Sequence, residues 1–450
     1  MSKTSSRLLT GRYDRNILRA ALAVTSAGIL VKIVATAKEF CVAGIYGRSD
    51  AMDAFLVAAL IPGLLVNLIS ESMNQALIPT FIRVQEREGR RQGQELLSSA
   101  LLWSCVLLVG VSALMALTTH LYFPLIAWRF SPQKIMLAEH LFFGLLPIVL
   151  LSGIASNCTA VLNTQERFAL PALAPIAVPL ATVAGAFALN GRVGIWALVY
   201  GTVLGGIIHA VLSVRMMEAQ GYRFRLCWYG SSKATLEVAR QYGPVLLSSV
   251  VASGGLLVDQ SMAAALPAGS VSALAYANRF VSVVITLLAG TLSSAVTPYF
   301  STIVAEADWS ACKRTLRTWR RMAALIAIPI ALLIMLGAHP LVRLALQHGA
   351  FGSRDTAVVT RVLVMYAIQI PFFVCSRVYY RFLLAMRRTD LIFYCGSLNL
   401  ALDIGLNLLF MRWMGVAGIA LATSIWTVNS LLFLWYWTHK LLKEKTGLPR

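Results

Sequence analysis

Several charged residues lie inside long apolar runs of this sequence, where they could bind an anionic group. Lys32, Lys38 and Glu39 are in the first run, and Arg279 is in a later one. Because Lys32 and Glu39 are seven residues apart, a helix places them on one face. A charge at the centre of a bilayer costs at least about 2.5–3.5 kcal/mol and normally faces a cavity or a partner. A cavity lined by these cations would suit a pyrophosphate, and structural ion pairs such as Lys32–Glu39 explain the same residues equally well.

A second set of polar residues, in the C-terminal half, could bind a small cation. Asn399 and Asp403 are four residues apart and share a helix face, and Asp259 is another carboxylate inside an apolar run. With a hydroxyl such as Thr423, they offer the oxygen ligands that a hard cation prefers. A small monovalent ion or a proton would fit this set. A polar network between helices is the alternative, and spacing alone favours that alternative.

The composition indicates which elements must position these groups. Of 450 residues, 58% are hydrophobic and 13% are charged, against about 45–50% and about 25% in soluble domains. This excludes a cytosolic enzyme, a secreted disulfide scaffold and a disordered regulator. The seven cysteines form no CxxC pair, which is typical of buried apolar roles and not of metal sites or disulfides. The expected fold is an all-α polytopic membrane protein.

Apolar runs long enough to cross about 30 Å of hydrocarbon recur along the whole chain. They predict about twelve transmembrane helices, and Pro171, Pro175 and Pro179 are expected to kink or break the fifth. The predicted spans are 17–46, 52–82, 96–119, 138–163, 169–189, 193–217, 241–266, 271–304, 318–338, 357–386, 389–411 and 414–439.

The basic residues predict how these spans are oriented. The formal net charge is +20. The connections on the side of both termini, together with the span ends that adjoin them, contain 26 Lys and Arg residues, against 7 on the other side. Since positive residues are retained on the cytoplasmic side, both termini are expected in the cytoplasm. This bias accounts for most of the net charge, so no nucleic-acid partner is required.

Two pairs of segments resemble each other at nearly the same offset of about 219 residues. Residues 52–86 can be aligned with 271–305, and GIWALVYG at 194–201 resembles GIALATS at 418–424. Few positions are identical, so chance is an alternative, but two matches in order favour a duplicated six-helix unit. Such a unit gives two lobes related by a pseudo-twofold axis along the membrane normal, with the substrate between them. The expected division is an N-terminal lobe at 1–217, a cytoplasmic linker at 218–240 and a C-terminal lobe at 241–450.

Four segments, in this order, resemble the MviN/MurJ family of lipid II flippases, in the multidrug/oligosaccharidyl-lipid/polysaccharide exporter superfamily. They are DAFLVAALIP…ESMNQALIPTF (53–81), LLVDQSMAAALPAGSVSALAYANRF (256–280), QHGAFGSRDT (347–356) and LNLALDIGLNLLFMRWMGVAGIALATS (398–424). Each segment is weak alone, but the ordered set extends over nearly the whole chain and is specific to the family.

The resemblance implies a flippase of the bacterial inner membrane that works by alternating access between two lobes. Its partners would be an undecaprenyl-pyrophosphate-linked saccharide, which is anionic, and the membrane lipids. In the family, cations of the first and eighth spans line the central cavity. The matching positions here are Lys32, Lys38 and Arg279, with Glu39 in place of a neighbouring acid.

The resemblance also implies a sodium ion. Family members hold it with an Asp of the seventh span, an Asn and an Asp of the eleventh and a Thr of the twelfth. The matching residues here are Asp259, Asn399, Asp403 and Thr423. No other cofactor is expected.

The chain departs from the family pattern at several points. Lysines stand where the family usually has two arginines, so the bidentate fork is lost although the charge is kept. The segment 62–67 reads PGLLVN and lacks a further cavity cation. Flippases of peptidoglycan synthesis generally carry two more C-terminal spans than the twelve predicted here. These departures leave transport intact but admit an exopolysaccharide or O-antigen repeat unit in place of lipid II.

Two other functions compete with the flippase. A multidrug exporter of the same superfamily would prefer an acidic cavity for cationic drugs, whereas this cavity is expected to be basic. A polyprenyl-dependent glycosyltransferase or ligase would need acidic or histidine groups in a sizeable outer loop. The outer connections are short, and metal motifs, nucleophile elbows and glycine-rich phosphate loops are absent from the sequence. The sequence therefore favours a transporter over an enzyme.

Overall fold

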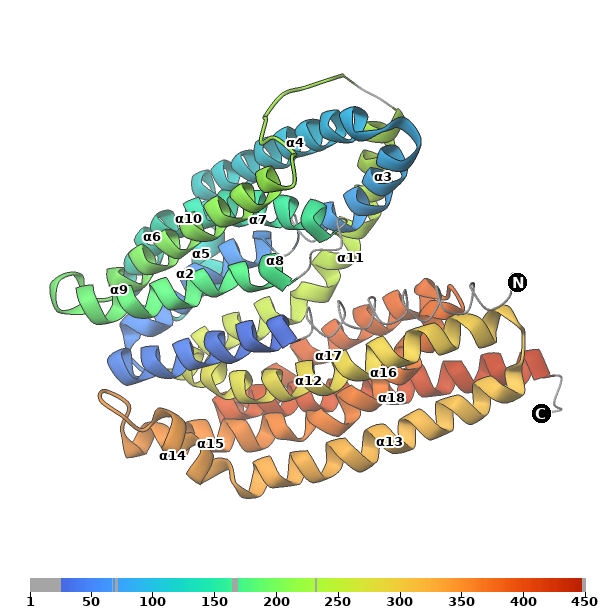
Figure 1. The fold of residues 1–450 in the computed structure, drawn as a ribbon. Helices are drawn as coiled ribbons and strands as arrows, with labels where there is room; N and C mark the ends of the chain where they lie inside the picture. The colour runs from blue at the N-terminus through green and yellow to red at the C-terminus, as the bar shows by residue number, and fades with distance from the viewer. Residues whose placement is uncertain (1–25, 67, 69–71, 164–168, 231–232, 447–450) are drawn as a thin grey trace, which may run out of the picture. The chain divides into compact units, whose positions relative to one another are not determined.

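The computed structural model describes residues 26–66, 68, 72–163, 169–230 and 233–446, and the regular structure in these ranges is helical (Figure 1). Residues 26–46 form the described part of the first helix. The helices that follow are α2 (Asp50–Leu65), α3 (Ser72–Glu88), α4 (Arg90–Leu117), α5 (Thr119–Ile126), α6 (Pro132–Leu145), α7 (Pro147–Asn163), α8 (Ala169–Leu173), η2 (Ala174–Ile176), α9 (Ala177–Val193), α10 (Trp196–Ala219), α11 (Lys233–Ala264), α12 (Ser270–Ala305), α13 (Trp309–Leu336), α14 (Ala338–Leu346), α15 (Ser353–Ala367), α16 (Gln369–Ala385), α17 (Thr389–Met414) and α18 (Val416–Thr446).

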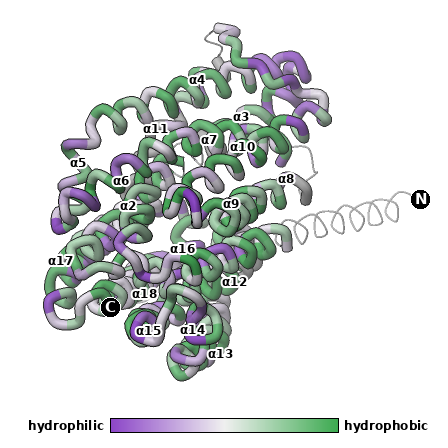
Figure 2. The backbone as a smooth tube through the Cα atoms, turned by 90° about the vertical axis from the view of Figure 1, so that its left-hand side faces the viewer, coloured by the Kyte–Doolittle hydropathy of each residue, from purple (hydrophilic) through white to green (hydrophobic). Residues whose placement is uncertain are grey.

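The described helices are those of a multi-pass membrane protein. Within the described ranges, nine stretches are long and apolar enough to cross a bilayer. Hydrophobic residues, drawn in green in Figure 2, predominate along the helices. Each of the nine overlaps one of the predicted spans. The other three predicted spans, 17–46, 52–82 and 241–266, are helical in their described parts up to residue 264. The all-α membrane fold is therefore confirmed, and the count of twelve stays a prediction. The fifth span is interrupted at Pro175, where a 3₁₀ turn (η2) separates α8 from α9. Pro171 and Pro179 lie within α8 and α9 and do not interrupt these helices.

The chain divides into two compact units. Unit 1 takes in the described residues up to Lys38 together with Ala58–Phe123 and Met136–Val250, and unit 2 takes in Glu39–Val57, Pro124–Ile135 and the residues from Val251 onward. Unit 1 therefore comes mainly from the N-terminal half and unit 2 mainly from the C-terminal half. The expected lobe boundaries at 217 and 241 stay a prediction.

Small residues allow the helices of unit 1 to approach closely. α10 packs along α9 and α7, and Gly201 and Gly205 of α10 lie against the backbone of α9. A Cβ atom built on Gly205 would lie 2.6 Å from the Cα atom of Val178. At the other side of the unit, an apolar core joins α3, α4, α7 and α11, with Phe81 and Tyr222 in ring contact at 5.7 Å. Small residues at the interface are the usual means by which helices associate in lipid.

Unit 2 is a bundle in which α12, α15, α16 and α18 pack around one another, with α13 against α16 and α17 against α18. Large aromatic side chains fill its interior, and the rings of Phe300 and Phe382 meet edge to face at 5.4 Å. The candidate functional residues described next lie on the first helix and on α11, α12, α17 and α18.

Candidate functional site

The cationic residues predicted to line a cavity occupy different environments. Lys32 lies on the first helix and is exposed, Lys38 is half-buried, and Glu39 is buried with 5% of its surface exposed. Among the described residues, no carboxylate forms an ion pair with Lys32. Lys32 is thus available to a ligand from outside the chain.

Arg279 forms an ion pair with Glu39. Its Nη2 atom donates a hydrogen bond to Oε1 of Glu39 at 2.8 Å, and 44% of the arginine side chain is exposed. The next residues stack beside the pair, with the rings of Phe40 and Phe280 at 5.1 Å. Glu39 therefore takes Arg279 of α12 as its partner, while the guanidinium keeps an accessible edge for a further acceptor.

The predicted convergence of these cations spans the two units. Lys32 and Lys38 belong to unit 1, whereas Glu39 and Arg279 belong to unit 2. The structure thus assigns Glu39 and Arg279 to one pair, and a common cavity with Lys32 and Lys38 stays a prediction.

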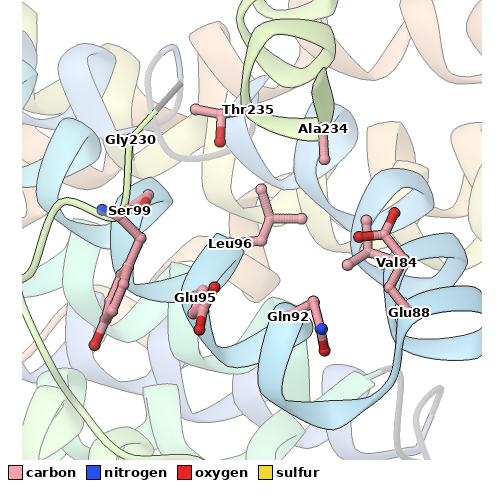
Figure 3. Close-up of a pocket in the computed structure, with 10 residues that line it drawn as sticks. Val84, Glu88, Gln92, Glu95, Leu96, Ser99, Gly230, Ala234 and Thr235 are labelled. Carbon is pink, nitrogen blue, oxygen red and sulfur yellow. Dashed lines mark hydrogen bonds between the residues drawn. The ribbon is translucent and has the colours of Figure 1, made fainter. Parts of the chain in front are cut away.

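A separate cavity of about 260 Å³ lies within unit 1. Figure 3 shows Glu88, Gln92 and Glu95 on one side and Ala234 and Thr235 on the other. No predicted site residue lines this cavity, and its carboxylates do not suit a pyrophosphate. It is therefore distinct from the predicted substrate cavity.

Three of the four residues of the predicted cation site lie together in unit 2. Thr423 of α18 donates a hydrogen bond to Oδ2 of Asp259 at 3.1 Å. Asn407 of α17 bridges the two carboxylates, since its Nδ2 atom donates to Oδ1 of Asp259 at 2.9 Å and to Oδ1 of Asp403 at 3.3 Å. All four side chains are buried. We call Asp259, Asp403, Asn407 and Thr423 the carboxylate cluster.

Asn399 is one turn away from this cluster and makes other contacts. Its Nδ2 atom donates to Oγ of Ser430 at 2.6 Å, and its Oδ1 atom accepts from Asn429 at 3.0 Å. Asn407 was not predicted from the sequence, and Asn399 as a ligand stays a prediction. The signal was present, because residues 399, 403 and 407 form one stripe of the helix.

The carboxylate cluster fits a small hard cation. The Oδ2 atom of Asp403 and the Oδ1 atom of Asn407 are buried and have no hydrogen-bond donor in the described chain. Neither Asp259 nor Asp403 forms an ion pair with a described Lys or Arg. Buried carboxylates without compensation are costly, and unpaired oxygen atoms are the ligands of hard cations. Carboxylate, amide and hydroxyl oxygens are hard donors, so the cluster suits a small hard cation better than a transition metal that prefers nitrogen or sulfur ligands.

A third polar network was not predicted and anchors the start of α12 in unit 2. Asp53 of α2 accepts hydrogen bonds from the backbone N–H groups of Gly269 at 2.7 Å and Ser272 at 2.9 Å. Lys134 pairs with Asp53 at 3.3 Å, and Arg48 donates to the carbonyl of Gly269 at 2.9 Å. Gly269 has φ +80°, and a Cβ atom there would lie 2.8 Å from the Arg48 carbonyl oxygen. A glycine is therefore required at this turn.

The family comparison covers most of the chain. The family described as "Lipid II flippase MurJ" matches residues 42–448. The chain belongs to this family. A "Lipid II flippase MurJ" of Burkholderia cenocepacia is 27% identical over 369 residues, which are 78% of this chain and 70% of that protein. A "Probable lipid II flippase MurJ" of Buchnera aphidicola subsp. Acyrthosiphon pisum is 22% identical over 435 residues, covering 96% of this chain and 84% of that one.

Solved structures of a lipid II flippase and of a multidrug transporter share the fold of this chain. "Lipid II flippase MurJ, inward closed conformation" matches with a TM-score of 0.81 and 23% identity over 93% of this chain and 87% of that one. An inward-facing multidrug resistance MATE family transporter of the MOP superfamily matches with a TM-score of 0.76 and 12% identity, over 96% and 100% of the two chains. The predicted family is therefore confirmed, and with it the prediction of a transporter and not an enzyme.

Proposed function

We propose that this chain moves an undecaprenyl-pyrophosphate-linked saccharide from the cytoplasmic to the outer leaflet of the bacterial inner membrane by alternating access. The observation that carries this proposal is the match of the lipid II flippase family to residues 42–448. Lipid II is the first candidate substrate, because the family is described by that name. Related lipid-linked repeat units share the same pyrophosphate and polyprenyl tail.

The chemistry of the described cations supports this substrate class. Lys32 is exposed, and the Arg279 guanidinium is 44% exposed beside its ion pair with Glu39. A pyrophosphate could accept hydrogen bonds from the free donors of both groups. When the pyrophosphate leaves, Glu39 alone compensates Arg279, so the empty site is not left with an unpaired guanidinium. The polyprenyl tail would remain in the lipid.

The test uses purified protein in liposomes and two fluorescent substrates, lipid II and a lipid-linked O-antigen-type repeat unit. We expect Lys32→Ala, Lys38→Ala and Arg279→Ala each to slow flipping at least about tenfold, a factor that corresponds to about 1.4 kcal/mol. Arg343→Ala is the control, because Arg343 is exposed on α14. Flipping of only one of the two substrates identifies the glycan. Unchanged flipping in all three variants would rule out the cationic site, and extrusion of cationic drugs instead of either lipid would favour an exporter.

The same proposal includes a sodium ion at the carboxylate cluster. Asp259, Asp403 and Thr423 would supply oxygen ligands. The side-chain amide oxygen of Asn399 or of Asn407, both on α17, would complete the set. The ion would compensate the buried carboxylates, and its binding and release would couple transport to the sodium gradient. The unpaired Oδ2 atom of Asp403 supports this assignment.

Orientation is the remaining element of the proposal. Both termini and the connection between α10 and α11 would lie in the cytoplasm. The side of the chain with these segments carries 26 Lys and Arg residues in its connections and the adjoining span ends, against 7 on the other side.

A further inference from the structure

Helix α13 of unit 2 has a buried face and an exposed face of different chemistry. The buried face packs on α16 and consists mainly of small residues, among them Cys312, Ala323, Ala327 and Ala331. The exposed residues at successive helical turns are Arg314, Arg317, Arg321, Leu325, Ile328 and Leu332. Their spacing of three or four residues places them on one continuous stripe, which we call the α13 stripe.

The α13 stripe changes abruptly from charged to apolar. Its first three residues are arginines, and from Leu325 onward it is apolar, with Leu325 itself 74% exposed. An exposed apolar surface of this kind on a membrane helix faces acyl chains. The arginines therefore lie at the level where acyl chains give way to headgroups. From Arg314 to Arg321 the helix rises about 10 Å, which is enough to span one headgroup layer of about 5–8 Å.

The C-terminal end of α18 adds further cations beside this basic end. α13 packs against α18, and the Nζ atom of Lys445 lies 5.9 Å from the ring of Trp309 at the start of α13. Lys440 lies over the ring of Trp437 at 4.7 Å. Tryptophan rings at this level are typical of the membrane interface, so the two helix ends form one interfacial surface.

Within the described chain, no ion pair is formed by the three arginines at the basic end of the stripe. Elsewhere in unit 2, Arg48 pairs with Asp355, and Lys134 pairs with Asp50. Arg317 and Arg321 form no ion pair with a described carboxylate. Arg314 has only the electrostatic attraction of Asp308, whose carboxylate already accepts hydrogen bonds from the backbone of Ala311 and from Ser310.

We propose that the basic end of the α13 stripe, Arg314, Arg317 and Arg321, binds the headgroup of an anionic phospholipid, with the acyl chains along Leu325, Ile328 and Leu332. Clusters of Lys and Arg next to a transmembrane helix attract anionic lipids. The apolar continuation of the same stripe distinguishes a lipid from a nucleic acid or a soluble phosphate, because only a lipid satisfies both parts. The exposed outer surface of one helix suits a bulk phospholipid better than a large saccharide carrier. This inference is independent of the transport proposal.

The test measures lipid binding to the purified full-length chain by native mass spectrometry, with phosphatidylglycerol and phosphatidylcholine as probes. We expect Arg314→Gln/Arg317→Gln/Arg321→Gln to weaken phosphatidylglycerol binding at least about tenfold and to leave phosphatidylcholine binding unchanged. The charge-conserving triple lysine variant should retain the binding, since the site needs charge and not the guanidinium fork. The matched control, Arg215→Gln/Arg223→Gln/Arg225→Gln, removes three exposed arginines from unit 1 and should bind as the unmodified chain does.

Several outcomes would overturn the proposal. Equal loss in the unit 1 control would mean that only the total charge matters. Equal affinity for the two phospholipids, or complete competition by glycerophosphoglycerol without acyl chains, would exclude a specific lipid site. Displacement of phosphatidylglycerol by a lipid-linked saccharide at equal concentration would assign the surface to the substrate. If the triple glutamine variant does not fold, Arg317→Gln alone is compared with Arg223→Gln. We then expect Arg317→Gln to weaken phosphatidylglycerol binding, by less than the triple variant would, and Arg223→Gln to leave it unchanged.

Discussion

Glu39 and the carboxylate cluster illustrate how the intramembrane charges of this chain are arranged. Glu39 on the first helix pairs with Arg279 on α12, and Asp259 on α11 is held by Asn407 and Thr423 from two other helices. In both cases the partner comes from a different part of the sequence. Helix periodicity predicts the face on which a residue lies, but it does not predict which other helix meets that face. This is why the Lys32–Glu39 alternative was plausible from the sequence and why Arg279 is the partner in the structure.

At the residue scale, the first prediction concerns sodium binding. A ligand that binds only the folded state increases the free energy of unfolding, by about 2.7 kcal/mol at a ligand concentration of 100 Kd, and thereby raises the unfolding temperature. We expect sodium chloride, compared with potassium chloride, to raise the unfolding temperature of the detergent-solubilised chain. Asp403→Asn should abolish this sodium-specific shift because it removes a charged ligand. Differential scanning fluorimetry across a sodium titration measures the effect without any transport assay.

The control for this experiment is Asp390→Asn on the same helix, because Asp390 is exposed and pairs with Arg388. It should leave the sodium shift unchanged. A comparison of Asn399→Ala with Asn407→Ala then identifies the amide ligand, since only the variant that removes it weakens the shift. A full sodium shift in Asp403→Asn would exclude the cluster as the ion site.

A second residue-scale prediction concerns pH. Arg83 of α3 donates a hydrogen bond to Oε1 of Glu237 of α11 at 2.9 Å and contacts its other oxygen, so the pKa of Glu237 is held below its ordinary value of 4.5. A carboxylate whose pKa is lower in the folded state than in the unfolded state stabilises the fold at pH values above the unfolded-state pKa. This contribution is lost as the pH falls through the folded-state pKa. We expect Glu237→Gln to lower the unfolding temperature slightly at pH 7 and to have no effect at a pH well below 4.5. Glu86→Gln, at an exposed position, should have no effect at either pH, and a pH-independent loss in Glu237→Gln would contradict the ion-pair explanation.

At the scale of the elements, the contact between α9 and α10 depends on the absence of a side chain. A Cβ atom on Gly205 would lie 2.6 Å from the Cα atom of Val178 and 2.9 Å from the Ala177 carbonyl oxygen, and neither backbone atom can move without shifting the helix. We expect Gly205→Ala to destabilise the chain by about 1–3 kcal/mol, the usual cost of overpacking. Gly110→Ala is the matched control, because nothing lies within 4 Å of a Cβ atom built on Gly110 of α4. Thermal unfolding in detergent compares the two, and equal stability of the variants would mean that the helices can separate at little cost.

The elements themselves were largely predictable, and the reason is physical. In lipid every backbone polar group must be satisfied within the segment, so an apolar run of sufficient length has to be helical, and nine of the predicted spans have such helices in the described chain. Pro175 likewise broke the fifth span because it lacks an N–H group. The capping of α12 by Asp53 was not predictable. It joins residues 216 or more positions apart, and no local pattern encodes such a contact.

At the scale of the whole molecule, charge asymmetry and the family fold support one membrane topology. Family membership assigns the chain to flippases, and the distribution of Lys and Arg outside the spans sets its expected orientation. The connection between α10 and α11 belongs to the basic side, since it includes Arg223 and Arg225. This connection also contains Cys227, which is exposed, whereas Cys41 is half-buried and the other five cysteines are buried. Cys227 is therefore a natural reporter of the topology.

The last prediction uses this reporter. In intact spheroplasts, a membrane-impermeant maleimide should leave Cys227 unlabelled, and permeabilisation should expose it to labelling, because the connection is expected in the cytoplasm. Gln133→Cys in a Cys227→Ser background is the matched control. Gln133 is exposed at the start of α6, in the connection predicted to lie outside, so it should be labelled without permeabilisation. Labelling of Cys227 in intact spheroplasts, together with protection of Cys at position 133, would invert the topology. The inversion would place the basic end of α13 in the outer leaflet and reverse the proposed direction of transport.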